Sequence, residues 1–249
     1  MRKDIIVHES PKAPISESIR LLRTNISFMC KNRDKQVLLV TSAVPGDGKS
    51  WVSANLAIAY AQTNKKVLLI DSDLRKGRQH KIFGKFNSNG FSDYLLSVAD
   101  EENLSIQEEV LIRTITTTDV PNLFLIPSGT VPPNPAELLD TQRIDDLIKI
   151  AKQKFDIIIF DMPPVNIVTD SLLICKKVDY TILVAAAEKT KKDMVLNAKK
   201  AIEHVGGKIA GVVLNKMPIE KRKEYSKYYS HYGAEETSLA QSRKRSNRR

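Results

Sequence analysis

Apolar residues follow two alternating patterns along this chain. Continuous apolar runs predict parallel strands buried on both faces, and apolar residues spaced three or four positions apart predict helices. Strands alternating with helices predict an α/β fold with a mostly parallel sheet and helices on both faces. The predicted strands are residues 36–42, 66–71, 122–129, 156–161, 179–186 and 208–215. The predicted helices lie within residues 10–32, 49–64, 90–98, 133–155, 169–178 and 191–205.

Several helix ends carry residues that favour such positions. Ser16 is the predicted N-cap of the first helix, because its hydroxyl can accept a hydrogen bond from the first turn. Asn64 is expected to end the second helix. Pro135 suits the first turn of its helix, where no backbone N–H is needed.

The patterns divide the chain into three predicted segments. Residues 1–35 form an N-terminal segment with a helix, residues 36–215 form the α/β domain, and residues 216–249 form a flexible tail of low apolar content. The tail holds four of the seven tyrosines in the chain, which are Tyr225, Tyr228, Tyr229 and Tyr232.

Positive charge is concentrated at the end of the chain. The formal net charge is +10, and the last eight residues, SRKRSNRR, contain no acid. Such a block is usually a solvated tail, but it can also bind anionic lipid or nucleic acid. The tyrosine cluster leaves the same alternatives open, since aromatic and basic residues together can stack on bases or lie at a membrane interface.

Composition argues against several classes of protein. No apolar run approaches the length of a membrane span, and the N-terminus lacks the apolar region of a signal peptide. Cys30 and Cys175 are isolated, which predicts reduced, buried thiols in the cytoplasm. The four histidines show no metal-binding spacing.

A glycine-rich loop follows the first predicted strand and precedes a helix. In residues 42–50, SAVPGDGKS, backbone N–H groups and the helix N-terminus can hold the phosphates of ATP. Lys49 would bridge the β- and γ-phosphates, and the Ser50 hydroxyl would bind Mg²⁺. These features predict a P-loop NTPase. The loop departs from the standard pattern at Ala43 and lacks the extra lysine of partition-type ATPases at Val44. The predicted nucleotide-binding residues of the loop are Pro45, Gly46, Asp47, Gly48, Lys49, Ser50 and Trp51.

Aspartates end two of the predicted strands. Asp71 and Asp73 follow one strand, and Asp161 ends another. Ligands of open parallel sheets bind beyond the carboxyl ends of the strands, so all three carboxylates are expected near Lys49. Ser50, Asp71 and Asp161 are the predicted Mg²⁺ ligands, and either Asp71 or Asp73 is the candidate base. Taken singly, such aspartates can also cap helices or face solvent.

These motifs resemble those of the bacterial tyrosine kinases (BY-kinases) of capsule and exopolysaccharide export. SAVPGDGKS, LLIDSDLRKG and IIIFDMPP resemble the Walker A, Walker A′ and Walker B motifs of that family. GTVPPNPAELL and ESIRLLR are also similar to stretches typical of it. The resemblance runs from about Ser10 into the tyrosine-rich tail.

The resemblance implies an ATP- and Mg²⁺-dependent protein-tyrosine kinase with Lys49, Asp71, Asp73 and Asp161 as its catalytic residues. It implies phosphorylation of the tail tyrosines in trans within a ring, typically an octamer. It also implies a separate membrane activator of the split Gram-positive arrangement and a phosphotyrosine phosphatase. The kinase would be cytoplasmic, recruited to the inner face of the membrane, and would not bind nucleic acid. Asn215 would contact the adenine, and the predicted ring-interface residues are Glu17, Arg20 and Arg23.

Three residues depart from the family pattern, and two other functions compete with the kinase. Trp51 stands where threonine is common, Gly77 where proline is frequent, and Met162 where a smaller residue is common. All three are expected to lower activity, and Gly77 to loosen its loop. The first alternative is a partition-type ATPase that acts as a nucleotide switch on membrane or DNA. The second is a scaffold in which assembly matters more than turnover.

Overall fold

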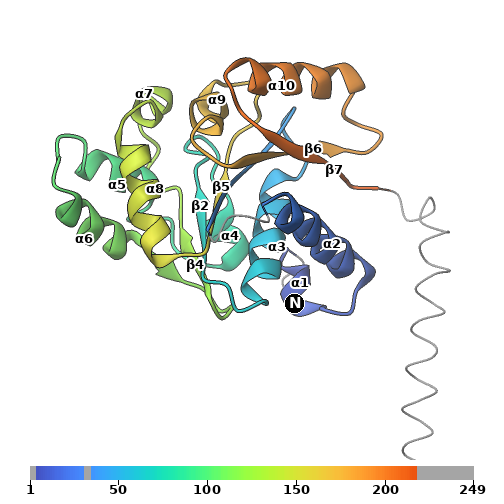
Figure 1. The fold of residues 1–249 in the computed structure, drawn as a ribbon, viewed down its shortest axis with the longest axis horizontal. Coiled ribbons are helices and arrows are strands. Elements are labelled where there is room, and N and C mark those ends of the chain that lie inside the picture. Colours follow the sequence, from blue (N-terminus) through green and yellow to red (C-terminus); the bar gives the residue numbers. More distant parts are fainter. Residues whose placement is uncertain (1–3, 31–34, 218–249) are drawn as a thin grey trace, which may run out of the picture. The chain divides into compact units, whose positions relative to one another are not determined.

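The computed structural model describes residues 4–30 and 35–217. The four tail tyrosines and the basic terminus lie outside these residues. Within these ranges, the residues up to Asn215 belong to one compact unit (Figure 1). None of the helices in the described ranges is long and apolar enough to cross a membrane.

A seven-stranded sheet forms the centre of the molecule, in the order β3-β4-β2-β5-β1-β6-β7. All neighbouring strands are parallel except β3 and β4, which are antiparallel. This arrangement confirms the predicted α/β fold with a mostly parallel sheet. The strands are β1 (Gln36–Ser42), β2 (Val67–Asp71), β3 (Thr116–Thr117), β4 (Leu123–Ile126), β5 (Ile157–Asp161), β6 (Tyr180–Ala186) and β7 (Ile209–Asn215).

Helices cover both faces of the sheet, as predicted. Along β1, Val37 and Leu39 join one apolar core, while Leu38 and Val40 join the other, because successive strand side chains point to opposite faces. Helices α1 to α4 pack on the second face and α5 to α10 on the first. The helices are α1 (Ile6–Glu9), α2 (Pro14–Met29), α3 (Lys49–Ala61), α4 (Gln79–Phe83), α5 (Phe91–Ser97), α6 (Leu104–Thr114), α7 (Pro135–Leu139), α8 (Arg143–Lys154), α9 (Asp170–Cys175) and α10 (Lys192–His204).

Two predicted helix boundaries are wrong. Ala13, not Ser16, is the N-cap of α2, because Pro14 occupies the first turn and Ser16 instead donates to the Ser10 carbonyl at 2.8 Å. The single helix predicted over residues 133–155 is two helices, since α7 ends at Leu139 and α8 begins at Arg143.

Other boundaries agree with their predicted causes. Pro135 is the first residue of α7. Asn64 adopts a left-handed conformation with φ of 60° shortly after α3 ends, and asparagine tolerates that region better than most residues. Strand β4 stops at Ile126, before the predicted end of its run, because Pro127 cannot donate a hydrogen bond to the sheet.

Candidate active site

The glycine-rich loop joins the carboxyl end of β1 to the N-terminus of α3. Gly46 and Gly48 have φ of 86° and 93°, in the left-handed region that favours glycine. Helix α3 begins at Lys49, so the free N–H groups of its first turn lie at this loop. The local backbone therefore suits a bound phosphate.

The Asp47 side chain fixes the loop to the neighbouring strand. One carboxylate oxygen accepts hydrogen bonds from the Ala186 N–H at 3.2 Å and from the Thr190 hydroxyl. The other accepts from the Val44 N–H at 3.2 Å. Asp47 was predicted to contact nucleotide, and with its carboxylate engaged in this way, that contact would come from its backbone.

Asn215 lies beside the same loop. Its side-chain amide donates to the Asp47 carbonyl oxygen at 2.9 Å. The end of β7 thus adjoins the phosphate loop, where a residue that contacts the nucleotide has to lie. Its contact with adenine stays a prediction.

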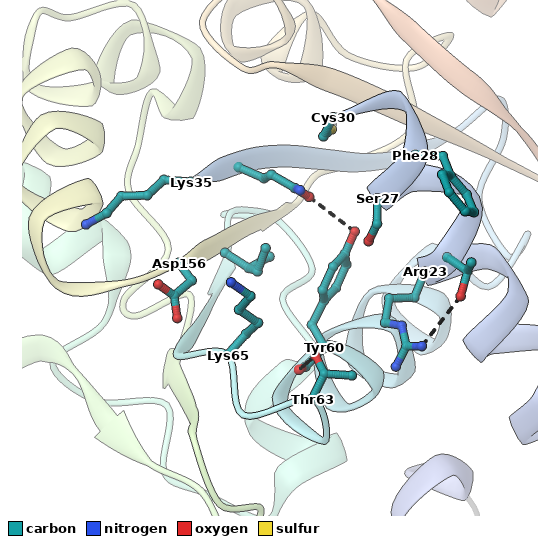
Figure 2. A pocket seen from close by; sticks show the side chains of 12 residues that line it. Arg23, Ser27, Phe28, Cys30, Lys35, Tyr60, Thr63, Lys65 and Asp156 are labelled. Carbon is teal, nitrogen blue, oxygen red and sulfur yellow. Dashed lines mark hydrogen bonds between the residues drawn. The ribbon is translucent and has the colours of Figure 1, made fainter. Parts of the chain in front are cut away.

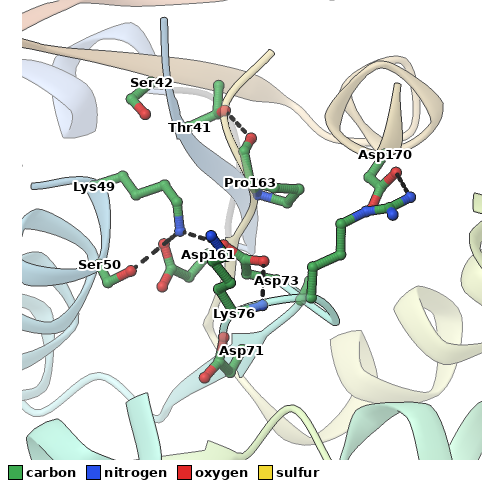
Figure 3. A network of polar contacts seen from close by, with 12 residues as sticks. Thr41, Ser42, Lys49, Ser50, Asp71, Asp73, Lys76, Asp161, Pro163 and Asp170 are labelled. Atoms are coloured by element: carbon green, nitrogen blue, oxygen red, sulfur yellow. Dashed lines mark hydrogen bonds and ion pairs between the residues drawn. The ribbon is translucent and has the colours of Figure 1, made fainter. Parts of the chain in front are cut away.

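Lys49 is the centre of the charged network at this edge of the sheet (Figure 3). Its ammonium lies 2.9 Å from Asp73 Oδ2, 3.8 Å from Asp161 Oδ1 and 3.2 Å from the Ser50 hydroxyl. Burial lowers the pKa of Lys49, but the nearby Asp161 and Asp73 carboxylates outweigh it, so the pKa is raised overall. Lys49 is therefore a fixed positive charge at the site.

Asp71 and Asp161 lie opposite each other at the ends of β2 and β5. Both residues are fully buried. Burial and the neighbouring Asp161 raise the pKa of Asp71 to about 8, although the Gln79 N–H and Lys49 lower it in part. Two carboxyl groups at paired positions on neighbouring strands suit a shared cation, which would favour their ionised forms.

The structure fits a magnesium ion at the predicted ligands. Asp71 Oδ1 is buried without a hydrogen-bond partner among the described residues. Two carboxylates and the Ser50 hydroxyl form an all-oxygen donor set, and Mg²⁺ commonly uses one or two carboxylates together with phosphate oxygens and water. In the described part of the chain, no group of three or more His, Cys, Asp or Glu side chains is placed to hold a metal ion by itself.

Several polar residues at the site make contacts that the sequence patterns did not predict. The Ser53 hydroxyl, one helical turn after Lys49, donates to Asp161 Oδ1 at 3.1 Å. Arg75 forms two hydrogen bonds, of 3.1 and 3.2 Å, with the fully buried Asp170 at the start of α9. These contacts fix the turn that carries Asp73 to a distant helix. The spacing of one helical turn between Lys49 and Ser53 could have predicted that Ser53 lies at the site. The Arg75–Asp170 pair joins residues far apart in sequence, so no local pattern predicts it.

Trp51 and the predicted interface residues lie away from this network. Trp51 packs against the apolar core beside α1 to α3. Arg20 forms an ion pair with Glu17 at 3.0 Å within α2. Arg23 donates to the Ala59 carbonyl at 3.1 Å, near the end of α3. The nucleotide contact of Trp51 and the interface role of the other three residues stay predictions.

A cavity of about 670 Å³ lies near the amino ends of β1 and β5 (Figure 2). Gln36 and Ile157, the first residues of these strands, contribute to its lining. The phosphate loop and the aspartates lie at the carboxyl ends. The cavity is therefore separate from the active site, and Arg23 and Tyr60 are among the residues that line it.

Gly77 is closely packed rather than loose. A Cβ atom at this position would lie 2.1 Å from Ser128 Oγ, 2.5 Å from Ser128 Cβ and 2.9 Å from Asp71 Oδ2. Ser128 is thus the nearest obstacle to a side chain here, and Asp71 is the next.

We expect Gly77→Ala to lower the free energy of unfolding by about 1–3 kcal/mol, because overpacking forces neighbouring atoms apart. Ser128→Gly removes both close Ser128 atoms, so the double variant should recover most of this loss. Urea unfolding of the two single variants and the double variant measures the coupling. Additive losses would show that Ser128 is not the obstacle.

The fold and this site define a nucleotide-binding protein of the P-loop class. A family model described as an AAA domain matches residues 24–208. The chain is 36% identical to the tyrosine-protein kinase YwqD of Bacillus subtilis, over 92% of this chain and 92% of YwqD. The chain belongs to the family of bacterial tyrosine-protein kinases of capsule and exopolysaccharide synthesis.

Solved structures agree with this assignment. The crystal structure of the chimerical protein CapA2B2 has a TM-score of 0.78 and 40% identity, covering 86% of this chain and 90% of that one. The septum site-determining protein MinD of Pyrococcus horikoshii, complexed with Mg-ADP, has a TM-score of 0.58 and 24% identity, covering 72% of this chain and 70% of that one. The MinD likeness shows a shared fold alone. The predicted family, an ATP-binding tyrosine kinase, is confirmed.

Proposed function

We propose that this kinase transfers the γ-phosphoryl group of ATP to tyrosines of its own C-terminal segment on a neighbouring subunit. The observation that carries the proposal is the convergence of Lys49 with three carboxylates beside the phosphate loop. Phosphoryl transfer depends chiefly on positioning and on charge stabilisation, which such a cluster supplies. The proposed acceptors are Tyr225, Tyr228, Tyr229 and Tyr232.

Magnesium would be held by Ser50, Asp71 and Asp161. Bound there, Mg²⁺ would neutralise charge on the phosphate oxygens during transfer. The unpartnered Asp71 oxygen and the opposed Asp161 carboxylate support this assignment. Lys49 supplies the second positive charge from the protein itself.

Asp73 is the proposed base. In the structure it is paired with Lys49 at 2.9 Å. When Lys49 turns to the β- and γ-phosphates, Asp73 loses that partner and can accept the proton of the tyrosine hydroxyl. The phosphoryl group then passes from the leaving oxygen of ADP to the tyrosine oxygen. The Asp73 carboxylate also accepts from the Lys76 N–H at 2.9 Å, which holds it in place.

The proposed setting is a ring, typically of eight subunits, with Glu17, Arg20 and Arg23 at the contacts. A membrane-embedded polysaccharide co-polymerase would recruit the cytoplasmic kinase to the inner face of the membrane and activate it through a cytosolic segment. Each phosphate adds a charge of about −1.5 to −2, which would loosen the ring by repulsion. A phosphotyrosine phosphatase would restore it, and the cycle would regulate polysaccharide synthesis and export.

Transfer between subunits can be tested by separating donor from acceptor. The donor carries phenylalanine at all four tail tyrosines, and the acceptor carries Lys49→Met with its tyrosines intact. We expect phosphate on acceptor tyrosines when the two proteins are mixed with ATP, Mg²⁺ and the activator's cytosolic segment. Mass spectrometry locates the modified residues.

Each protein alone is a control: the acceptor should stay unmodified at these tyrosines, and the donor lacks them. An unmodified acceptor in the mixture, alongside tail phosphorylation of unaltered protein, would argue for transfer within one subunit. ATP consumption by unaltered protein with no tyrosine modified would contradict the kinase proposal. That outcome would favour the nucleotide switch of partition-type ATPases.

A further inference from the structure

One buried glutamine contacts all three proposed magnesium ligands. Gln79 is the first residue of α4 and is fully buried. Its side-chain amide donates to Asp161 Oδ2 at 2.7 Å and to the Ser50 carbonyl at 2.9 Å. Its backbone N–H donates to Asp71 Oδ2 at 2.8 Å. A single residue thus joins the Walker A helix, the Walker A′ strand and the Walker B strand.

The two acceptors that face the Gln79 amide determine how it is oriented. A flipped amide would place Oε1 against the Asp161 carboxylate and the Ser50 carbonyl, which are both acceptors. In the observed orientation Gln79 Oε1 is buried without a hydrogen-bond partner among the described residues, as is Asp71 Oδ1. The glutamine therefore gives up a hydrogen bond of its own while its N–H groups hold the ligands.

We propose that Gln79 is a positioning residue that sets the affinity of this site for its metal ion. This inference rests on the proposed function, because it takes Ser50, Asp71 and Asp161 as the ligands. Hydrogen bonds that orient metal ligands typically change metal affinity 10- to 100-fold when they are removed. Gln79 holds the Asp71 carboxylate by its backbone N–H, and its side-chain amide holds the Asp161 carboxylate and the backbone carbonyl of Ser50.

Gln79→Met separates these two functions. Methionine is close to glutamine in length, and it keeps the backbone bond to Asp71. It removes both amide donors to Asp161 and Ser50. We expect about 10- to 100-fold weaker Mn²⁺ binding, measured by electron paramagnetic resonance with a non-hydrolysable ATP analogue present. Fluorescent ADP binding in EDTA should stay within about twofold of unaltered protein, since the metal is absent.

Gln107→Met is the matched control. Gln107 is also fully buried, and its amide also donates to a carbonyl, that of Glu101, and to a carboxylate, that of Asp146. Its Oε1 likewise is without a hydrogen-bond partner among the described residues. It lies on α6, so losing its amide should change stability but leave Mn²⁺ affinity unchanged.

Three outcomes separate the inference from the function on which it rests. Unaltered protein that binds no Mn²⁺ would overturn the proposed metal site and the inference together. Unaltered protein that binds Mn²⁺ no more tightly than Gln79→Met would overturn the inference alone. If Gln79→Met does not fold, Gln79→Asn keeps the donors one carbon short of their partners, and unchanged Mn²⁺ affinity in that variant would also overturn it.

Discussion

The Lys49→Met variant is expected to lose phosphoryl transfer by about 10³-fold or more, since removing one charge-stabilising donor alone costs about 10²–10³ in rate. Lys49 lies between Asp73 and Asp161 and has a raised pKa, so its side chain stays positively charged. It is therefore the cation that would stabilise negative charge on the phosphates during transfer. Initial rates of tyrosine phosphorylation with ATP and Mg²⁺ measure the effect.

The same variant should be less stable without ligands. Removing the Lys49 ammonium leaves the buried carboxylates of Asp73 and Asp161 without their cation, and an unpaired buried charge lowers the stability of the folded protein. Thermal unfolding in EDTA should therefore show a lower midpoint. Lys199→Met, which removes only an exposed ion pair with Glu203, should change neither property measurably. Normal transfer rates in Lys49→Met would exclude Lys49 from catalysis.

The sheet and the position of the nucleotide site were readable from the sequence because continuous apolar runs permit few alternatives. Strand β5, IIIFD, is buried at every position, so its pattern matches a central strand. Asp161 at its end then had to lie near Asp71, since parallel strands end at one edge of the sheet. The P-loop motif placed Lys49 at the same edge.

Short elements and contacts between distant residues were not readable. Helices α1 and α4 have four and five residues, too few to show a period. Gln79 stands in a polar stretch, and only the folded chain brings its amide to Asp161. Asp170 resembles an ordinary helix-start residue until Arg75 is seen to pair with it. These short helices and contacts depend on the packing of the folded chain, and not on the local sequence pattern.

Asp71→Asn is expected to lower phosphoryl transfer by about 10²–10³-fold while making the ligand-free protein more stable. Asparagine keeps the size of Asp71 and an acceptor for the Gln79 N–H. It removes a buried carboxylate held against Asp161. The two effects have opposite signs because the carboxylates that would bind the cation repel each other when the cation is absent.

The gain in stability should grow with pH. The pKa of Asp71 is raised from 3.8 to about 8 on folding, so the folded protein holds a proton that the unfolded chain has released. Unaltered protein in EDTA therefore loses stability as pH rises from about 4 to about 8, and Asp71→Asn escapes this loss. Denaturant unfolding at several pH values measures the difference.

Asp170→Asn tests whether the sign of this effect depends on the partner. Asp170 is as fully buried as Asp71, but it is paired with Arg75. Removing its charge should destabilise the protein, because Arg75 loses its partner and two hydrogen bonds weaken. Opposite signs for two equally buried aspartates would show that Asp71 is kept for its chemistry and Asp170 for the fold. A destabilised Asp71→Asn would instead show that Asp71 is ionised and satisfied without a metal ion.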